Sequence, residues 1–178
     1  NKTTDYEFNK TDVTGDKEVE GAQLTITDED GNVVDQWTSD GKVHSIEGLV
    51  VGKTYTLSET VTAKDYVKAT DIKFTVKNSS ELETVTMKDK QVFVSKTTVG
   101  GEEVTGAHMQ IIDEDGNIID EWYSEGKSHI ANGLEEGKTY TLHEDLSPLG
   151  FNLANDFTFE VTKEKEKQTV EMVDPVTE

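Results

Sequence analysis

The sequence lacks cysteine and arginine, contains only two prolines, and has no long hydrophobic run. Without cysteine the chain forms neither disulfides nor thiolate metal sites, so another kind of cross-link is worth seeking in domains of this size. No stretch approaches the roughly 18 apolar residues of a membrane span, and no basic-then-apolar signal segment begins the chain. We therefore expect a piece of a longer protein, with any export and anchoring signals elsewhere.

Charge of one sign dominates the composition. There are 37 Asp and Glu residues against 17 basic residues, and the formal net charge is −20. This field repels phosphate backbones and anionic lipid, so we expect neither nucleic-acid binding nor membrane insertion in this segment. Hydrophobic residues make up 33% of the chain, which suits small β-domains that bury one face of each sheet.

The chain is an internal repeat with a spacing of 85 residues. Segments 52–57 and 137–142 share the sequence GKTYTL. The same spacing relates single residues along both halves: Trp37 and Trp122, His44 and His129, Phe74 and Phe159, Met87 and Met172, Asp89 and Asp174. We predict two homologous domains, residues 1–89 and 90–178, with almost no linker.

Each copy has the pattern of short β-strands. Val, Ile, Thr, Tyr and Phe alternate with polar residues over runs such as 23–27, 54–57 and 72–76. Asp-Gly pairs at 30–31 and 115–116 lie between such runs and indicate β-hairpins. About seven short strands in each repeat are typical of an immunoglobulin-like β-sandwich. The predicted fold class is all-β, with two tandem sandwiches.

In both copies, three charged residues stand where strand alternation calls for the next core residue. In the first copy Lys10 follows Tyr6 and Phe8 on the same face of its strand, Glu59 follows Tyr55 and Leu57, and Asp89 follows Val85 and Met87. In the second copy Lys96 follows Val92 and Val94, Glu144 follows Tyr140 and Leu142, and Asp174 follows Val170 and Met172. Lys96 lies 86 positions after Lys10 because the loop 14–19 has one extra residue. One interpretation places these residues in water past the strand ends, since Lys, Glu and Asp are rarely buried unless paired. The other brings each set of three together inside its domain.

Three buried charges would be costly, and a cross-link between Lys and Asp removes two of them. For the amine to attack the carboxyl group, Lys must be neutral and Asp protonated, a proton transfer that costs roughly 9 kcal/mol in water. Burial shifts both pKa values in the required direction. The Glu would hydrogen-bond to both reactants and transfer protons as the amide forms and water leaves.

These motifs resemble the CnaB-type, prealbumin-like domains of Gram-positive adhesins and pilins. The segments that carry the resemblance are 6–12 (YEFNKTD), 20–22 (EGA), 55–60 (YTLSET) and 85–89 (VTMKD), then 94–96 (VSK), 105–107 (TGA), 140–144 (YTLHE), 147–151 (SPLGF) and 170–174 (VEMVD). The second copy is similar in particular to the streptococcal fibronectin-binding-protein domain used for split peptide ligation. The resemblance implies a single-turnover isopeptide bond in each domain, with no other enzyme activity. It assigns amine partners Lys10 and Lys96, acyl partners Asp89 and Asp174, and catalytic acids Glu59 and Glu144.

The first copy departs from the family pattern after Glu59. Residues 61–66 (VTAKDY) stand where the family usually has an Ala-Pro-x-Gly-Tyr turn. Many relatives use Asn in place of the Asp, but Asn78 and Asn155 fall outside the alternating register and are not favoured as acyl partners.

Two repeated patterns suggest metal chemistry but are better explained by structure. The loops 28–32 and 113–117 begin like a calcium loop, but glycine is fourth rather than sixth, so a hairpin turn is predicted. His44 and His129 have no local second ligand and are predicted at half-exposed strand positions. We expect no metal and no cofactor. The repeated aromatic residues predicted to pack over the sandwich or at its end are Trp37 and Trp122.

The leading functional prediction is a structural stalk or spacer in an extracellular, cell-wall-anchored protein. Its partners would be neighbouring repeats of the same parent, and its isopeptide bonds would give mechanical, thermal and protease resistance. The alternative is a module that binds a host extracellular matrix protein, which a contiguous exposed apolar patch on one domain would favour. A sugar-binding module would need an exposed row of aromatics, whereas the five Tyr and two Trp lie mostly in core-like register.

Overall fold

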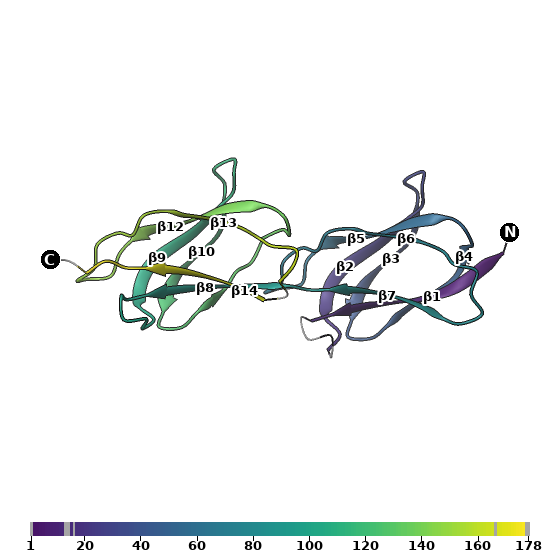
Figure 1. Ribbon diagram of the computed structural model, residues 1–178, viewed down its shortest axis with the longest axis horizontal. Coiled ribbons are helices and arrows are strands. Elements are labelled where there is room, and N and C mark those ends of the chain that lie inside the picture. Colours follow the sequence, from purple (N-terminus) through teal and green to yellow (C-terminus); the bar gives the residue numbers. More distant parts are fainter. Residues whose placement is uncertain (1, 13–14, 16, 166, 177–178) are drawn as a thin grey trace. The chain divides into compact units, whose positions relative to one another are not determined.

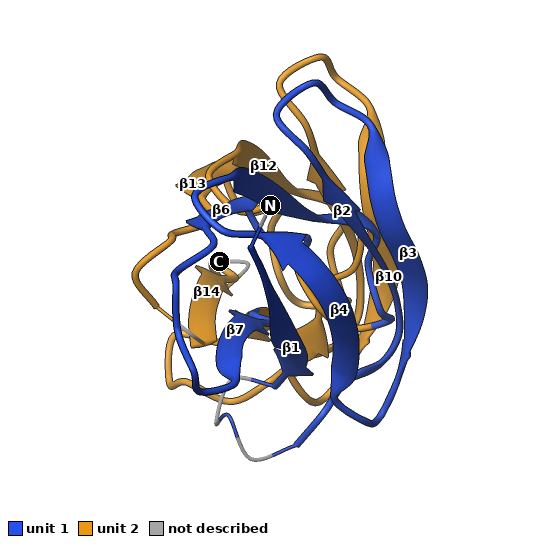
Figure 2. Cartoon of the chain, turned by 90° about the vertical axis from the view of Figure 1, so that its right-hand side faces the viewer, with its two compact units in different colours: residues 1–64, 68–90 blue, residues 65–67, 91–178 orange. Residues whose placement is uncertain are grey.

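The computed structural model describes residues 2–12, 15, 17–165 and 167–176, so part of the predicted one-residue insertion, Thr14 and Asp16, lies outside the described residues. The chain divides into two compact units (Figure 2). Unit 1 comprises Asn1–Lys64 and Lys68–Lys90, and unit 2 comprises Asp65–Val67 and Gln91–Glu178. All regular elements of the described residues are β-strands. Within the same residues, no helix is long and apolar enough to span a membrane.

Unit 1 is a sandwich of two sheets (Figure 1). Its strands are β1 (Thr3–Thr11), β2 (Glu20–Thr27), β3 (Val33–Asp40), β4 (His44–Val50), β5 (Thr54–Val61), β6 (Ile72–Thr75) and β7 (Glu83–Lys88). One sheet has the strand order β4-β1-β7 and the other β3-β2-β5-β6. Strand β1 pairs with β4 in antiparallel fashion and with β7 in parallel fashion. The first and last strands of the unit therefore run side by side in the same direction.

Unit 2 repeats this architecture. Its strands are β8 (Gln91–Thr97), β9 (Thr105–Ile112), β10 (Ile118–Glu125), β11 (His129–Ile130), β12 (Thr139–Leu146), β13 (Phe157–Glu160) and β14 (Lys167–Val173). The sheets have the orders β11-β8-β14 and β10-β9-β12-β13, and β14 again pairs with β8 in parallel fashion. The prediction of an all-β chain with two tandem sandwiches is confirmed.

Strand alternation builds the core of each unit, because every second side chain points between the two sheets. In β1, Tyr6 and Phe8 are buried, while Glu7 and Asn9, the residues that follow each of them, are more exposed. The core of unit 1 consists of Tyr6, Phe8, Leu24, Ile26, Ile46, Leu49, Tyr55, Leu57, Val76 and Met87. Residues from both sheets contribute to this core, so the two sheets are held together by apolar packing.

The acidic loop between β2 and β3 is the predicted hairpin turn. The Asp28 carboxylate accepts main-chain N–H groups from Asp30 and Asn32, each at 2.9 Å. The Asn32 main-chain N–H holds the pKa of Asp28 below its ordinary value. Gly31 adopts φ +84°, a left-handed conformation that glycine accepts without steric cost. The loop 113–117 has the same hydrogen bonds, and the described residues include no group of three His, Asp or Glu arranged to hold a metal ion.

A stacked Trp and His join the edges of the two sheets. The rings of Trp37 on β3 and His44 on β4 lie 3.9 Å apart and nearly parallel, and His44 Nε2 is 2.8 Å from Asp35 Oδ2. Unit 2 has the same arrangement. The ring centroids of Trp122 and His129 lie 3.8 Å apart, and His129 Nε2 is 2.8 Å from Asp120 Oδ2. Both histidines are half-buried on strands, as predicted. Both tryptophans pack at one side of their sandwich, where β3 meets β4 and β10 meets β11.

Candidate functional site

The first strand of each unit carries a buried lysine. The alternation that buries the apolar residues of β1 and β8 continues to Lys10 and Lys96, and each is only 2% exposed. The main-chain N–H of Lys10 donates to Glu18 Oε2 at 3.0 Å, and that of Lys96 donates to Glu103 Oε2 at 3.2 Å. These bonds fix the backbone of both strands at the residue whose side chain enters the core.

An aspartate follows the last strand of each unit. Asp89 is the first residue after β7, and the parallel register places this end of β7 beside Lys10. The Asp89 main-chain N–H donates to Thr11 O at 2.8 Å, so the pairing continues past the strand end. Asp174 makes the same bond to Thr97 O at 2.8 Å, and both aspartates are 0% exposed.

In unit 1 the third residue comes from the facing sheet. Glu59 on β5 points inward and is 1% exposed. Lys10 Nζ lies 2.8 Å from Glu59 Oε2 and also contacts Asp89 Oδ1. Among the described residues Lys10 Nζ has no partner in hydrogen-bond geometry, so these contacts are ion pairs. The amine thus lies between two carboxyl groups with no water-exposed surface around it.

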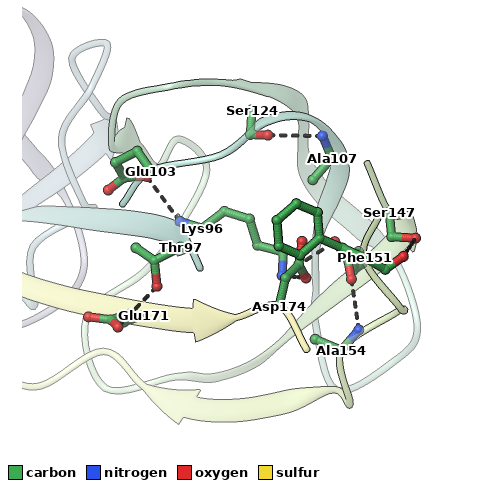
Figure 3. Close-up of polar contacts among 11 residues, drawn as sticks. Lys96, Thr97, Glu103, Ala107, Ser124, Ser147, Phe151, Ala154, Glu171 and Asp174 are labelled. Carbon is green, nitrogen blue, oxygen red and sulfur yellow. Dashed lines mark hydrogen bonds and ion pairs between the residues drawn. The ribbon is translucent and has the colours of Figure 1, made fainter. Parts of the chain in front are cut away.

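Unit 2 has the same arrangement (Figure 3). Lys96 Nζ contacts Asp174 Oδ1, and it lies 3.3 Å from Oε2 of Glu144, which β12 contributes from the facing sheet. Glu144 is 1% exposed. The structure therefore brings the predicted Lys, Glu and Asp of each copy together, and the alternative placement in water past the strand ends does not hold.

Burial favours the neutral form of one residue in each site. Removal from water raises the pKa of Asp89 to about 7. The positive charge of Lys10 lowers this pKa, and the negative charge of Glu59 raises it, but burial has the largest effect. Burial likewise lowers the pKa of Lys96. Oδ2 of Asp89 has no hydrogen-bond partner among the described residues, which disfavours the ionised form of this carboxyl group further, and Oδ2 of Asp174 likewise has no partner there. The site thus places an amine beside two carboxyl groups, which are the groups that amide formation with acid–base catalysis requires.

Some residues of the site were not predicted. Glu18 and Glu103 obey the 85-residue spacing, so the repeat itself could have identified them. Ala69 and Ala154 contribute only a main-chain N–H, which leaves no side-chain signal in the sequence. The two asparagines that were not favoured are exposed and lie outside both sites: Asn78 and Asn155.

The sequence matches the family described as "SpaA: Prealbumin-like fold domain" twice, over residues 4–91 and 90–176. No curated protein matches the chain. Among solved structures it is similar to shaft pilin SpaA from Lactobacillus rhamnosus GG, with 15% identity, 99% of each chain covered and a TM-score of 0.44. The Bacillus anthracis TIE protein is 21% identical over 100% of this chain and 35% of its own, with a TM-score of 0.44. A streptococcal ancillary pilin is 18% identical over 97% of this chain and 62% of its own, also with a TM-score of 0.44.

The family match covers nearly the whole chain and agrees with the prealbumin-like resemblance predicted from the motifs. The chain belongs to the SpaA prealbumin-like fold domain family and contains two consecutive copies of the domain.

Proposed function

We propose that each unit forms an intramolecular isopeptide bond, Lys10 to Asp89 in unit 1 and Lys96 to Asp174 in unit 2. The observation that carries this proposal is the burial of an amine against two carboxyl groups in both copies. The neutral amine attacks the aspartic acid carbon, a C–N bond forms, and a C–O bond breaks. The hydroxyl leaves as water with one proton from the amine.

The glutamate of each site acts as the catalytic acid and base in this proposal. Glu59, and Glu144 in unit 2, accepts a proton from the attacking nitrogen and delivers it to the leaving hydroxyl, so it ends the reaction unchanged. Its Oε2 lies 2.8 Å from the amine nitrogen in unit 1 and 3.3 Å in unit 2, within reach for that transfer. Each unit reacts once, so the chain is not an enzyme in the usual sense.

We further propose that residues 1–89 and 90–178 are spacer domains of an extracellular, cell-wall-anchored adhesin or pilin. The topology supports this role, because β1 and β7 are parallel neighbours. Tension that enters at the start of β1 passes through the Lys10–Asp89 bond and leaves after Asp89, so the segment 11–88 carries no load. The partners of such a spacer are neighbouring repeats of the same parent protein.

The mass of the purified chain tests the proposal. We expect it to be lower than the sequence mass by one water for each bond, with formal net charge unchanged because one cation and one anion are consumed together. Protease digestion followed by mass spectrometry should recover the two pairs of joined peptides. A chain of unmodified mass, with no joined peptides, would leave two ordinary acidic sandwiches.

A second candidate function, binding of a host matrix protein, is favoured by a feature found in unit 2. A groove of about 680 Å³ is lined by residues that precede β13 and residues at the end of β14. Its exposed apolar side chains are Val99, Leu153, Phe157 and Val173. In unit 1 the residues 85 positions before Leu153 and Val173 are Lys68 and Lys88. The two units therefore differ at two positions of this face, where unit 2 has apolar residues and unit 1 has lysines.

Exchange of these residues tests the second candidate. If the groove binds collagen or fibronectin, the variant with Leu153→Lys and Val173→Lys should bind the immobilised protein about tenfold more weakly in surface plasmon resonance. The control carries Thr158→Lys, at an exposed position of β13, and Ser128→Lys, which together add the same two positive charges at exposed positions outside the groove. Lack of binding by the unaltered chain, or equal affinity for all three chains, would leave the spacer role alone.

A further inference from the structure

The second oxygen of each catalytic glutamate is held by a main-chain donor. The Ala69 N–H donates to Glu59 Oε1 at 3.0 Å, and the Ala154 N–H donates to Glu144 Oε1 at 2.7 Å. Both donors lie in the loop that follows the glutamate's strand, β5–β6 in unit 1 and β12–β13 in unit 2. In each site Oε1 therefore faces the loop, while Oε2 faces the lysine.

We propose that these two main-chain N–H groups are positioning groups for isopeptide formation, an inference that rests on the proposed function. A glutamate side chain rotates freely about its terminal bond unless a partner fixes it. A donor on Oε1 fixes the plane of the carboxyl group and leaves Oε2 directed at the amine. Proton transfer depends on such alignment within hydrogen-bond distance, so the loop is part of the reacting site.

The two loops reach this arrangement by different means. In unit 2 the loop is closed by Ser147 Oγ donating to Phe151 O at 2.9 Å, and Gly150 adopts φ +91°. The β5–β6 loop of the first copy lacks the family's Pro and Gly, and there Asp65 adopts a left-handed φ of +71° at the position of Gly150. Aspartate is one of the few other residues that visits this region. The loop sequence differs, yet the donor to the glutamate is retained in both copies.

Unit 1 gains a second donor that unit 2 lacks at the same place. Thr62 Oγ1 lies 3.4 Å from Glu59 Oε1, whereas its counterpart Ser147 bonds within the loop instead. Glu144 thus receives one donated bond on Oε1 among the described contacts, and it is the shorter of the two main-chain bonds. Unit 2 is therefore the unit in which loss of the N–H has the clearer effect.

The test replaces the donor in unit 2 and keeps unit 1 as an internal reference. Ala154→Pro removes the N–H, whereas Ala154→Gly keeps it. We expect the Lys96–Asp174 bond to form about 10- to 100-fold more slowly in Ala154→Pro than in the unaltered chain, and Ala154→Gly to retain nearly the full rate. The linked fraction of each unit is followed after rapid purification by intact mass and by joined peptides.

A second variant separates loss of the donor from disturbance of the fold. Replacing Ala154 by its α-hydroxy acid analogue, lactic acid, keeps the side chain and exchanges only the N–H for an ester oxygen. Slow linkage in unit 2 of this variant, beside complete linkage in unit 1, supports the proposal. Linkage at the unaltered rate overturns it. If neither unit of the unaltered chain becomes linked, the proposed function itself fails, which is a separate outcome.

A stability measurement distinguishes positioning from a purely structural role. In a Glu144→Ala chain the Ala154 N–H has lost its acceptor, so the ester exchange should leave the melting midpoint of unit 2 unchanged. Equal midpoints with and without the ester support positioning of the glutamate. A clear drop on ester exchange in this background assigns the N–H to loop stability and overturns the proposal.

Discussion

Replacing Lys10 by alanine is expected to restore one water of mass to the chain and to lower the melting temperature of unit 1, while the bond in unit 2 still forms. Opening the cross-link frees a loop of about 80 residues, and the chain-entropy relation used for disulfides gives a loss of roughly 4.5 kcal/mol. That is comparable to the entire stability of a small domain. Differential scanning calorimetry and limited proteolysis should both report the change in unit 1.

The control for this variant is Lys42→Ala, which removes an exposed lysine from the same unit. It should keep the mass deficit of two waters and the melting profile of the unaltered chain. If Lys10→Ala showed the same mass deficit as the control, the amine would have to come from another residue, and the assignment of Lys10 would be wrong.

The pH dependence of Lys10→Ala gives a second readout of the same change. Burial raises the pKa of Asp89 to about 7, so the folded state binds this proton more tightly than the unfolded state does. A raised carboxyl pKa contributes stability at low pH that is lost as the pH rises from about 4 through about 7. In Lys10→Ala the positive charge that lowers the Asp89 pKa is absent, so the pH range over which this stability is lost extends to higher pH. The unlinked unit 1 should therefore melt at a lower temperature at pH 8 than at pH 5.

Adding Asp89→Asn to the Lys10→Ala chain tests whether Asp89 causes the pH dependence of the melting temperature. An amide does not titrate, so the double variant should lose the pH dependence of the melting midpoint between pH 5 and pH 8. The same dependence in the double variant would assign it to a group other than Asp89.

Much of the fold and of the site was predictable because both depend on alternation along single strands. Tyr6 and Phe8 set the inward face of β1, and the next residue on that face is Lys10. The same step along β5 leads to Glu59 and along β7 to Asp89. The repeat strengthened the prediction that these three charged residues meet inside the domain, because the second copy carries the same three residues at the corresponding strand positions.

The parts that could not be predicted depend on contacts between segments far apart in the chain. The sequences of β1 and β7 contain no local signal that the two strands pair in parallel, yet this pairing places Asp89 beside Lys10. The hydrogen bond between Asp35 and His44 depends on where the edges of two sheets meet. The exposure of Leu153, at 55%, is decided by which side of the sandwich stays open, and apolar patterning alone assigns such a residue to a core.

Replacing Glu59 by alanine is expected to stop bond formation in unit 1 and to leave the bond in unit 2 intact, so the mass deficit falls from two waters to one. Among the described ion pairs of Lys10 Nζ, Glu59 is the one besides Asp89 itself, so its loss removes the group placed to move a proton from nitrogen to the leaving hydroxyl. General acid–base catalysis contributes about 100- to 10,000-fold, so the uncatalysed reaction should be far from complete in a freshly purified chain. Unit 2 keeps its own lysine, aspartate and glutamate. In that unit Glu144 Oε1 still accepts the Ala154 N–H at 2.7 Å, and Lys96 Nζ still contacts Glu144 and Asp174, so unit 2 reacts independently.

Glu59→Gln is the sharper form of this experiment. The amide oxygen can still accept the Ala69 N–H, so the side chain keeps its place in the core, but it cannot carry a proton between the reactants. We expect a folded unit 1 with Lys10 and Asp89 adjacent and unlinked, detected as one added water relative to the unaltered chain. Glu47→Ala, at an exposed position of β4, is the control and should keep both bonds. Loss of both bonds in Glu59→Gln, or of neither, would show that Glu59 is not the catalytic acid of unit 1, whereas loss of one bond in a folded chain separates proton transfer from packing.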